Sequence, residues 1–340
     1  MRRSALPLLD ERLRGTKFVT LQSKSVLNSP EQTGMDFWSL NPYVGCEFGC
    51  TYCYARYAHR YVVERAHHAG KLSDADFTDF RGPNGWEAFE RRIFVKEQIL
   101  GVLETDLRRF FRSARPATRS CDTIVIGTAT DPYQPAERRF RITRAVLERL
   151  ARCEGLSLGL ITKSPLVVRD ASLLAEIQRR HDLEVHVSLI TLDVALIRAL
   201  EARSPMPAVR LRALKRLTDA GVNAGLIVAP VLPGITDDAP RLAALFQAAR
   251  AAGARFLTAS PLRLYPGIRD RFLPVLDEHF PHLARRYRQA YACRGAAPHD
   301  YAQALSRRIR KLQLKWGFPV WHMADRYEKR RPAPQRELPL

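Results

Sequence analysis

Three cysteines lie close together in one short segment, at Cys46, Cys50 and Cys53. Three thiolates leave a tetrahedral zinc site one ligand short. They can instead hold three irons of a [4Fe–4S] cluster and leave the fourth iron open to another ligand. Gly45 and Gly49 let the loop wrap closely around such a compact group, because glycine adopts backbone conformations that other residues avoid. The C-x3-C-x2-C spacing therefore favours an iron–sulfur site.

Two other interpretations of this segment stay open on the residues alone. Zinc is the first, with His59, His67 or His68 as a fourth ligand. A chance group of buried cysteines is the second, since free cysteine is a common core residue. The remaining cysteines show no compact spacing for a second cluster, and we expect them to be small core residues: Cys121, Cys153 and Cys293.

The chain carries a strong excess of positive charge. Its 340 residues include 55 Lys and Arg against 35 Asp and Glu, which gives a formal net charge of +20. Such a surplus suits a polyanionic partner such as nucleic acid, although a solvated, arginine-rich surface gives the same composition. Several cations fall in the C-terminal region, at Arg285, Arg286, Arg288, Arg307, Arg308, Arg310, Lys311 and Lys315.

Composition also excludes several classes of protein. No run of 18 or more apolar residues is present, so we expect no transmembrane helix and no membrane partner. The first residues lack the apolar core and the cleavage site of a signal peptide, which predicts a cytoplasmic protein. Six cysteines are too few for a secreted disulfide scaffold of this length.

Apolar, β-branched runs alternate with helical periods along most of the chain. Near-continuous apolar strands indicate a parallel sheet that helices cover on both faces. The helical stretches show stripes such as Ile142, Val146 and Leu150, and Asp170 and Asp237 or Asp238 are expected N-caps. The expected strands are 35–40, 122–127, 156–161, 184–190, 223–228 and 255–260.

Six strands are fewer than the eight of a complete barrel, so we predict an α/β fold built on a partial (β/α)6 TIM-like barrel. Polar residues at the C-terminal ends of such strands are where chemistry collects. The predicted organisation is an N-terminal extension (1–34), the partial barrel (35–268) with an inserted helical segment (61–120, helices within 86–113), a basic helical C-terminal region (269–328) and a disordered tail (329–340).

Several segments resemble one enzyme family. The C-x3-C-x2-C motif after a first strand resembles that of the radical S-adenosylmethionine (SAM) superfamily. The residues of six segments further resemble its spore photoproduct lyase-like branch. Those segments are SLNPYVGCEFGCTYCYAR (39–56), RIFVK (92–96), GTATDPYQPAERRFRITR (127–144), ITKSPLVVRD (161–170), VSLITLD (187–193) and GLIVAPVLPGITD (225–237).

The resemblance implies a function and its cofactors. Members of this family bind a [4Fe–4S] cluster and SAM, and take an electron from an external donor of the flavodoxin or ferredoxin type. Reductive cleavage of SAM gives a 5′-deoxyadenosyl radical, which abstracts hydrogen from a substrate. The cofactors supply the chemistry, and the protein positions them and excludes water.

The resemblance also assigns residues. Cys46, Cys50 and Cys53 would bind the cluster, and Tyr52 would lie beside the adenine of SAM. Lys163 would face the methionine moiety of SAM, where an ammonium group can meet a carboxylate. The remaining SAM contacts would be Thr130 at the methionine moiety, Ser188 through a hydrogen bond, and Gly225 and Ile227 as an apolar wall for the adenine.

Other polar residues after the second predicted strand have two alternative roles. Asp131, Gln134 and Glu137 form a polar patch that either contacts the substrate or supports the residues that do. Asp131 precedes a proline, so it also fits a turn or a helix cap. On the residues alone, Ser188 also fits a hydrogen-bonded core hydroxyl.

One position departs from the family pattern. Spore photoproduct lyase has a cysteine near the end of its second strand that returns a hydrogen atom to the substrate radical, and Thr128 stands at the matching position here. A hydroxyl is a poor hydrogen-atom donor compared with a thiol, and Cys293 is a distant alternative. This departure puts the thymine-dimer substrate in question, and a role in DNA repair stays an expectation that rests on the resemblance alone.

Three functions remain as expectations. The first is a radical SAM enzyme with an unidentified substrate, with nucleic acid as the candidate that the charge suggests. The second is a non-catalytic nucleic-acid-binding protein with a structural metal site, and the third is a radical SAM enzyme that acts on a protein or a small metabolite. Aromatic residues that can stack on bases, or pack in the core, are Tyr287, Tyr291, Tyr301, Trp316 and Trp321.

Overall fold

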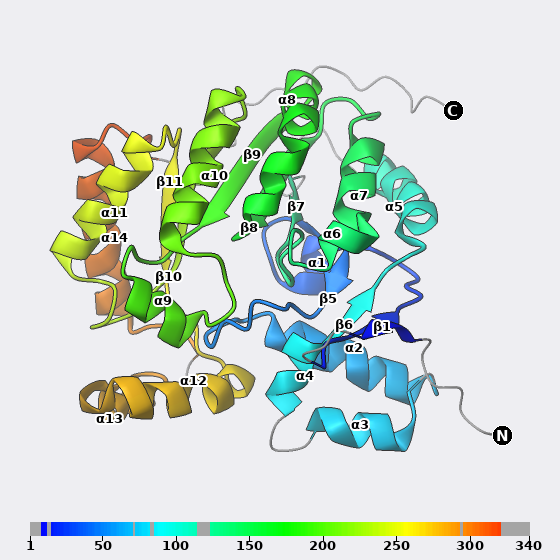
Figure 1. Cartoon of the computed structure of the whole chain (residues 1–340), viewed down its shortest axis with the longest axis horizontal. Coiled ribbons are helices and arrows are strands. Elements are labelled where there is room, and N and C mark those ends of the chain that lie inside the picture. Colours follow the sequence, from blue (N-terminus) through cyan, green and yellow to red (C-terminus); the bar gives the residue numbers. More distant parts are fainter. Residues whose placement is uncertain are drawn as a thin grey trace.

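The centre of the molecule is a curved, mostly parallel sheet (Figure 1). The computed structural model describes residues 8–11, 15–70, 72–81, 85–113, 123–292 and 295–320. The sheet has seven strands in the order β11-β10-β9-β8-β7-β4-β3. They are β3 (Leu27–Asn28), β4 (Trp38–Leu40), β7 (Thr123–Ile126), β8 (Ser157–Thr162), β9 (Asp182–Ser188), β10 (Ala224–Val231) and β11 (Leu257–Pro261).

The six strands from β4 to β11 are parallel, and only the short edge strand β3 is antiparallel to its neighbour. In the described part of the chain β3 and β11 stay at opposite edges, so the barrel is open. The prediction of a partial barrel of six parallel strands is confirmed. The first of them is shorter than expected, since pairing with β7 begins only at Trp38.

Helices follow the strands and cover the outer face of the sheet (Figure 1). Their buried residues form the predicted stripes, for example Val146, Leu147 and Leu150 in α7. The covering helices are α7 (Ile142–Leu150), α8 (Ala171–Arg180), α10 (Pro207–Asp219) and α11 (Ala239–Ala251). Shorter helical turns lie between them, namely α6 (Glu137–Phe140), the 3-10 helix η2 (Pro165–Asp170) and α9 (Val194–Leu200).

The two expected N-caps behave differently. Asp238 caps α11, because its carboxylate accepts the backbone N–H of Arg241 at 2.9 Å. Asp170 precedes α8 without capping it. Its carboxylate instead bonds to Arg144 and Arg169, each at 2.7 Å. Strong cationic donors have therefore displaced the local backbone contact that the sequence suggested.

A second, smaller sheet joins the N-terminal extension to the inserted segment. Its order is β1-β2-β6-β5. The prediction that 61–120 is helical is wrong at β6, because Ile93, Phe94 and Val95 are buried between β2 and β5. The strands are β1 (Leu8–Glu11), β2 (Lys17–Thr20), β5 (Tyr43–Val44) and β6 (Arg92–Val95). Helices α2 (Arg56–His68) and α4 (Gly85–Arg91) contact this sheet, and α3 (Asp74–Arg81) packs on both of them. Helices α1 (Pro30–Thr33) and α5 (Ile99–Ser113) contact the large sheet instead.

The C-terminal region is helical, as predicted, and is built from α12 (Pro266–His279), α13 (Pro281–Ala290) and α14 (His299–Lys315). Helix α14 packs on α11 and β11, and α12 contacts α2. Helices α12 and α13 lie below the sheet in Figure 1, on the same side as α2, α3 and α4. In the described part of the chain, every helix is too short or too polar to span a lipid bilayer.

The aromatic residues of this region are mostly core residues. Tyr287 and Tyr291 are each only 2 % exposed and stack on one another, so the interpretation of these two rings as base-stacking groups is wrong. Tyr301 and Trp316 are half-buried against the same core. Trp321 and the predicted disordered tail lie outside the described residues. The C-terminal cations are exposed on the outer faces of α13 and α14.

Candidate active site

The cysteine loop, which we define as residues 41–54, follows β4 at the C-terminal edge of the sheet. Gly45 and Gly49 both have positive φ angles, of 91° and 65°. A Cβ at Gly45 would lie 2.9 Å from the carbonyl oxygen of Phe89, and one at Gly49 would lie 2.7 Å from the carboxylate of Glu90. Both turns therefore need glycine, for conformation and for space, as expected.

The segment after β7 holds the backbone of this loop. The hydroxyl of Thr130 donates to the carbonyl of Gly45 at 2.6 Å, and the amide of Gln134 donates to the same oxygen at 3.2 Å. The side-chain oxygen Oε1 of Gln134 accepts a hydrogen bond from the backbone N–H of Glu47 at 2.9 Å. The Glu47 carboxylate accepts the N–H of Ala136 at 2.7 Å. Predicted site residues Thr130 and Gln134 thus fix the path of the cysteine loop.

Cys46 and Cys50 are buried and Cys53 is half-buried, and the three thiols affect one another electrostatically. Burial raises the pKa of Cys46, Cys50 and Cys53, and the neighbouring thiols raise the pKa of Cys46 further. An apolar setting of this kind keeps free thiols protonated, so a metal must replace the protons when it binds. The donor set suits a cluster, in which each thiolate binds a different iron atom.

The zinc interpretation has less support. Zinc needs four ligands within about 2.0–2.3 Å of one ion. Among the described residues, no three His, Cys, Asp or Glu side chains converge on a single metal ion. His59 is buried against Phe89 and shares a 3.2 Å hydrogen bond with the carbonyl of Arg92. His67 pairs with Asp74 at 2.7 Å and stacks on Phe77.

A buried ionic network lies on the β9 side of the cysteine loop. The ammonium of Lys163, directly after β8, donates to the hydroxyl of Ser188 at 2.8 Å and lies 3.6 Å from the carboxylate of Glu201. The same ammonium lies 5.8 Å from the centre of the Tyr52 ring, and the Tyr52 hydroxyl donates to Glu201. Three predicted SAM residues, Tyr52, Lys163 and Ser188, are therefore brought together by Glu201.

Glu201 is itself held by Arg210, and both side chains are fully buried. The guanidinium of Arg210 also donates to the carbonyls of Ser188, at 2.9 Å, and Pro205, at 2.7 Å. Burial alone would raise the pKa of Glu201, but Lys163 and Arg210 outweigh it and lower that pKa to about 2. Burial would likewise lower the pKa of Lys163, yet Glu201 outweighs it and the pKa is raised. Both groups are charged at neutral pH.

Sequence reasoning missed Glu201 and Arg210, although a signal was present. Arg210 falls on the same helical stripe of α10 as the buried residues Ala213, Leu214 and Leu217. A cation at such a position is rarely buried without a partner. The stripe therefore predicts a buried anion nearby, but its identity needs the tertiary structure.

Arginines also surround Glu90 beside the loop. The guanidinium of Arg56 donates to the carbonyl of Cys50 at 2.9 Å and to Glu90 at 2.6 Å. Arg203 also pairs with Glu90, and Arg271 lies 3.8 Å from it. This excess of positive charge favours the anionic thiolates that metal binding requires.

The two acidic residues predicted at the site, Asp131 and Glu137, are hydrogen-bonded to other groups of the protein. The carboxylate of Asp131 accepts the hydroxyl of Thr162 and the N–H of Lys163, each at 2.7 Å. Glu137 is fully buried and accepts the hydroxyl of Tyr43 at 2.6 Å and Arg169 at 2.9 Å. Of the two roles predicted for Asp131 and Glu137, these contacts favour support of the site.

Thr128 lies at the end of β7 beside the cysteine loop. Its hydroxyl is 2.6 Å from that of Ser39, and it accepts the side-chain amide of Asn41 at 3.0 Å. Its carbonyl accepts the hydroxyl of Tyr54, the residue after the third cysteine. Thr128 is thus enclosed in a polar cluster, and the alternative hydrogen-atom donor Cys293 lies outside the described residues.

Strand β10 supplies the remaining predicted SAM residues. Ile227 pairs with Ser188 of β9, so both side chains point to the same face of the sheet. Gly225 lies two residues earlier on that face. A Cβ at Gly225 would lie 2.4 Å from the ring of Phe256, so glycine makes room for this ring. The ring of Phe256 therefore lies against Gly225 on this face of the sheet.

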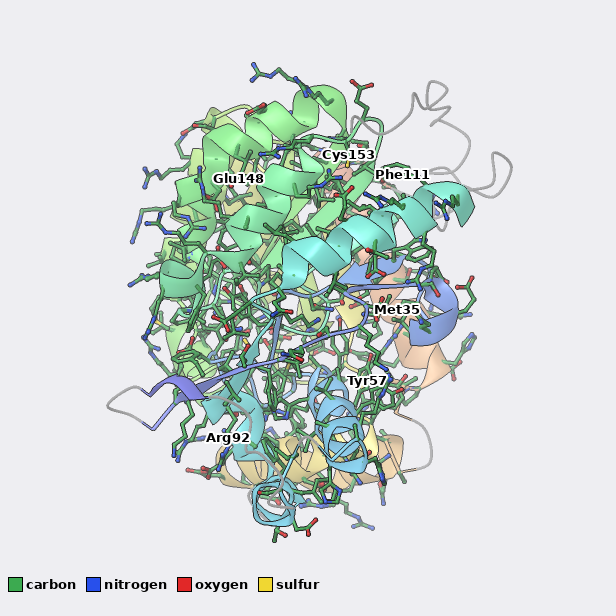
Figure 2. The ribbon with its side chains drawn as sticks, turned by 90° about the vertical axis from the view of Figure 1, so that its right-hand side faces the viewer. Met35, Tyr57, Arg92, Phe111, Glu148 and Cys153 are labelled. Atoms are coloured by element: carbon green, nitrogen blue, oxygen red, sulfur yellow. The ribbon has the colours of Figure 1, made fainter. Side chains whose placement is uncertain are left out.

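The described cysteine outside the loop is remote from the site. Cys153 is buried, and Figure 2 places it in the upper half of the molecule, whereas Tyr57 of α2 lies in the lower half. Its thiol lies 3.3 Å from the guanidinium of Arg149. This agrees with the prediction of a core residue. Cys121 lies outside the described residues.

Two solved structures illustrate the similarity of the fold to spore photoproduct lyase. The lyase in complex with a dinucleoside spore photoproduct has a TM-score of 0.58 and 15% sequence identity, covering 88% of this chain and 79% of that chain. A mutant of the lyase with bound AdoMet and the same dinucleoside has a TM-score of 0.56 and 15% identity, covering 82% and 74%. At this identity the likeness shows the fold alone.

Sequence relatives extend over nearly the whole chain. A protein of Mycobacterium tuberculosis, described as uncharacterised, is 33% identical over 322 residues, which are 94% of this chain and 84% of the relative. One from Methanocaldococcus jannaschii, also described as uncharacterised, is 24% identical over 221 residues, covering 65% and 70%. The family model described as "Radical SAM superfamily" matches residues 40–246. This match contains the cysteine loop and the strands from β7 to β10, and the chain therefore belongs to the radical SAM superfamily and is a radical SAM enzyme.

Proposed function

We propose that this enzyme reductively cleaves SAM at a [4Fe–4S] cluster held by Cys46, Cys50 and Cys53, and that the resulting 5′-deoxyadenosyl radical abstracts hydrogen from a nucleic-acid substrate. The observation that carries the first part is that the cysteine loop lies at the same edge of the sheet as Lys163, whose ammonium is 5.8 Å from the ring of Tyr52 between the second and third cysteines. Lys163 lowers the pKa of the Cys50 and Cys53 thiols, against the larger effect of burial. The metal and SAM sites are therefore electrostatically coupled.

Lys163 gives this site a fixed positive charge for the carboxylate of SAM. Its ammonium is pinned between the Ser188 hydroxyl at 2.8 Å and the Glu201 carboxylate at 3.6 Å. An ammonium has three donors, so two contacts with protein leave one N–H for a ligand. Glu201 keeps the ammonium charged without neutralising the surroundings, because Arg210 balances it from the opposite side.

Tyr52 and the β10 residues are the proposed surroundings of the adenine. Tyr52 is buried, and its hydroxyl is tied to Glu201, so its ring cannot rotate freely. Ile227 and the Gly225–Phe256 pair offer apolar surface on the neighbouring strand. Thr130 is proposed at the methionine moiety, next to the Gly45 carbonyl that it already holds. Apolar and enclosed surroundings also exclude water from a reactive radical.

Two features support nucleic acid as the substrate class. The net charge of +20 gives long-range attraction to a polyanion, and the cations of α13 and α14 are exposed. A structural neighbour, spore photoproduct lyase, has been solved with a dinucleoside ligand. The reductant is proposed to be an external protein of the flavodoxin or ferredoxin type, because enzymes of this family need an electron from outside.

The test is an anaerobic assay on the reconstituted, reduced enzyme. We expect about four irons per chain and release of 5′-deoxyadenosine from SAM. With deuterated DNA or RNA oligonucleotides as substrate, deuterium should appear in the 5′-deoxyadenosine. One zinc per chain with no SAM cleavage would instead support a non-catalytic nucleic-acid-binding protein.

An enzyme that acts on a protein or a small metabolite is the remaining alternative. It predicts SAM cleavage without deuterium transfer from any oligonucleotide. It also predicts nucleic-acid binding that is weak and insensitive to salt, whereas contacts to phosphates weaken steeply as salt rises. A titration of labelled DNA and RNA at several salt concentrations separates the two.

A further inference from the structure

Tyrosine rings gather on one exposed face at the edge of the active site. Large apolar side chains are exposed at only a few described positions, and four of them are Tyr54, Tyr57, Tyr61 and Tyr265, at 37%, 49%, 56% and 45%. Tyr54 directly follows the third cysteine and precedes α2, and Tyr57 and Tyr61 are four residues apart on one side of that helix. Tyr265 begins α12, which contacts α2. We call these four residues the tyrosine face.

The rings of the tyrosine face are arranged for stacking. Tyr54 and Tyr57 have ring centres 6.3 Å apart and ring planes inclined by 27°. Tyr57 is close enough to Tyr265 that the latter raises its pKa, after the larger effect of burial. Tyr265 is held in place from behind, because a Cβ at Gly295 would lie 2.3 Å from its ring. Rigid, exposed rings of this kind are the platforms on which unpaired bases stack.

Positive charge flanks these rings. The guanidinium of Arg65 lies 5.5 Å from the centre of the Tyr61 ring and is exposed. Arg263 is exposed and lies two residues before Tyr265 in the chain. The nearest acidic side chain on α2, Glu64, is already paired with Arg60 at 2.8 Å. Aromatic rings beside exposed arginines complement a strand whose bases alternate with phosphates.

The tyrosine face is continuous with the candidate active site. Tyr54 is adjacent to Cys53 in sequence, and its hydroxyl points inward to the carbonyl of Thr128 while part of the side chain remains exposed. In Figure 2, Tyr57 lies beside the helix α2 on the side of the molecule that faces the viewer. A chain of bases along α2 would therefore lead from Tyr61 to the site.

We infer that the tyrosine face binds unpaired bases of single-stranded nucleic acid and leads one of them to the active site. This inference rests on the proposed function in one respect, namely that the bound strand is the substrate. Stacked pairs inside a duplex cannot reach such rings, so the face selects single strands, loops or displaced nucleotides.

The test measures binding of fluorescein-labelled DNA and RNA oligonucleotides, about 12 nucleotides long, as single strands and as the matching duplexes. The protein is the full chain, reconstituted anaerobically, and binding is followed by fluorescence anisotropy. The variants are Tyr57→Ala/Tyr61→Ala and Tyr57→Phe/Tyr61→Phe. The matched control is Leu314→Ala, which removes another exposed apolar side chain, from α14.

We expect the double alanine variant to bind single strands at least about 10-fold more weakly, since each base–ring stack contributes about 5- to 100-fold. The phenylalanine variant keeps the rings and should bind like the wild type, as should Leu314→Ala. An unchanged Kd in the alanine variant overturns the inference. The inference is also overturned if the phenylalanine variant binds single strands as weakly as the alanine variant, or if the alanine variant binds duplexes more weakly by the same factor.

Arg65→Gln gives a separate measurement that does not depend on removing any ring. A guanidinium that contacts a phosphate should lower the slope of log K against log salt by about 1 when it is lost. An unchanged slope contradicts the placement of the strand beside Arg65. Failure of the wild-type enzyme to cleave SAM would overturn the proposed function, while the binding result would still decide the role of the tyrosine face.

Discussion

Two buried carboxylates lie near the cysteine loop, and they are built from similar parts. Glu137 and Glu201 are both fully buried, both accept a tyrosine hydroxyl, and both pair with an arginine. The difference lies in their other partners. Glu137 accepts the backbone N–H of Thr143 at 2.8 Å, whereas Glu201 faces the Lys163 ammonium at 3.6 Å.

This difference separates a structural network from a functional one. Glu137 accepts hydrogen bonds from Tyr43, from the backbone of Thr143 and from Arg169. Its carboxylate therefore stabilises the segment between β7 and α7. Glu201 contacts Lys163, Tyr52 and Arg210, and its charge raises the pKa values of Lys163 and Arg210 against the opposing effect of burial. Burial and pairing alone do not mark a functional residue. The distinguishing feature of Glu201 is its partner Lys163, whose ammonium has a third N–H donor for a ligand.

The largest expected effect is on the cluster itself. Cys50→Ala removes one of three thiolates, so we expect the reconstituted protein to lose its cluster, with iron falling from about four per chain to near zero. Cys153→Ala is the matched control, since this thiol is buried but remote. Iron and sulfide analysis measures both. A full cluster in Cys50→Ala would show that another residue is the ligand.

Glu201→Gln and its counterpart Glu137→Gln test the comparison directly. Removing the charge of Glu201 leaves Arg210 buried and unpaired, which costs about 3–5 kcal/mol of unfolding free energy. Both variants should be less stable in urea. Only Glu201→Gln should also weaken SAM binding, because only Glu201 fixes Lys163 and Tyr52. Isothermal titration with SAM would contradict the comparison if both variants lost affinity equally.

Lys163→Ala should weaken SAM binding and leave the iron in place. A charge-assisted hydrogen bond contributes about 1.5–3 kcal/mol, so Kd for SAM should rise by about 10- to 100-fold. Lys163→Arg is the matched variant, because it keeps the charge while changing the shape of the donor group. Unchanged SAM affinity in the alanine variant would refute the role assigned to Lys163.

The smallest effect is on the pH dependence of stability. The pKa of Glu201 is lowered from 4.5 to about 2 in the folded state. Its contribution to stability is therefore complete above its unfolded pKa and is lost as pH falls toward the folded value. The stability difference between wild type and Glu201→Gln should stay constant from about pH 6 to pH 8 and shrink below about pH 4. Urea unfolding across this range measures it, and a difference that persists at the acid end would contradict the pairing.

Much of the fold followed from local patterns. The β-branched runs placed five of the six parallel strands, because a strand buried on both faces must be apolar throughout. Strand β6 was missed, since a four-residue strand between two helices has the same apolar character as a helical turn. The two tyrosine groups show the same limit, because helical spacing occurs in the buried Tyr287 and Tyr291 and in the exposed Tyr57 and Tyr61.

The sequence by itself predicted the three cysteines as cluster ligands, the glycines directly before Cys46 and Cys50, and the alternation of strands and helices. These depend on short spacings and local periodicity, which survive without knowledge of the rest of the chain. Only the tertiary structure decided that Glu201 and Arg210 join Lys163, Ser188 and Tyr52. Charges at those positions are ordinary in a linear sequence, and they acquire a role because folding removes water from between them and leaves each dependent on its neighbours.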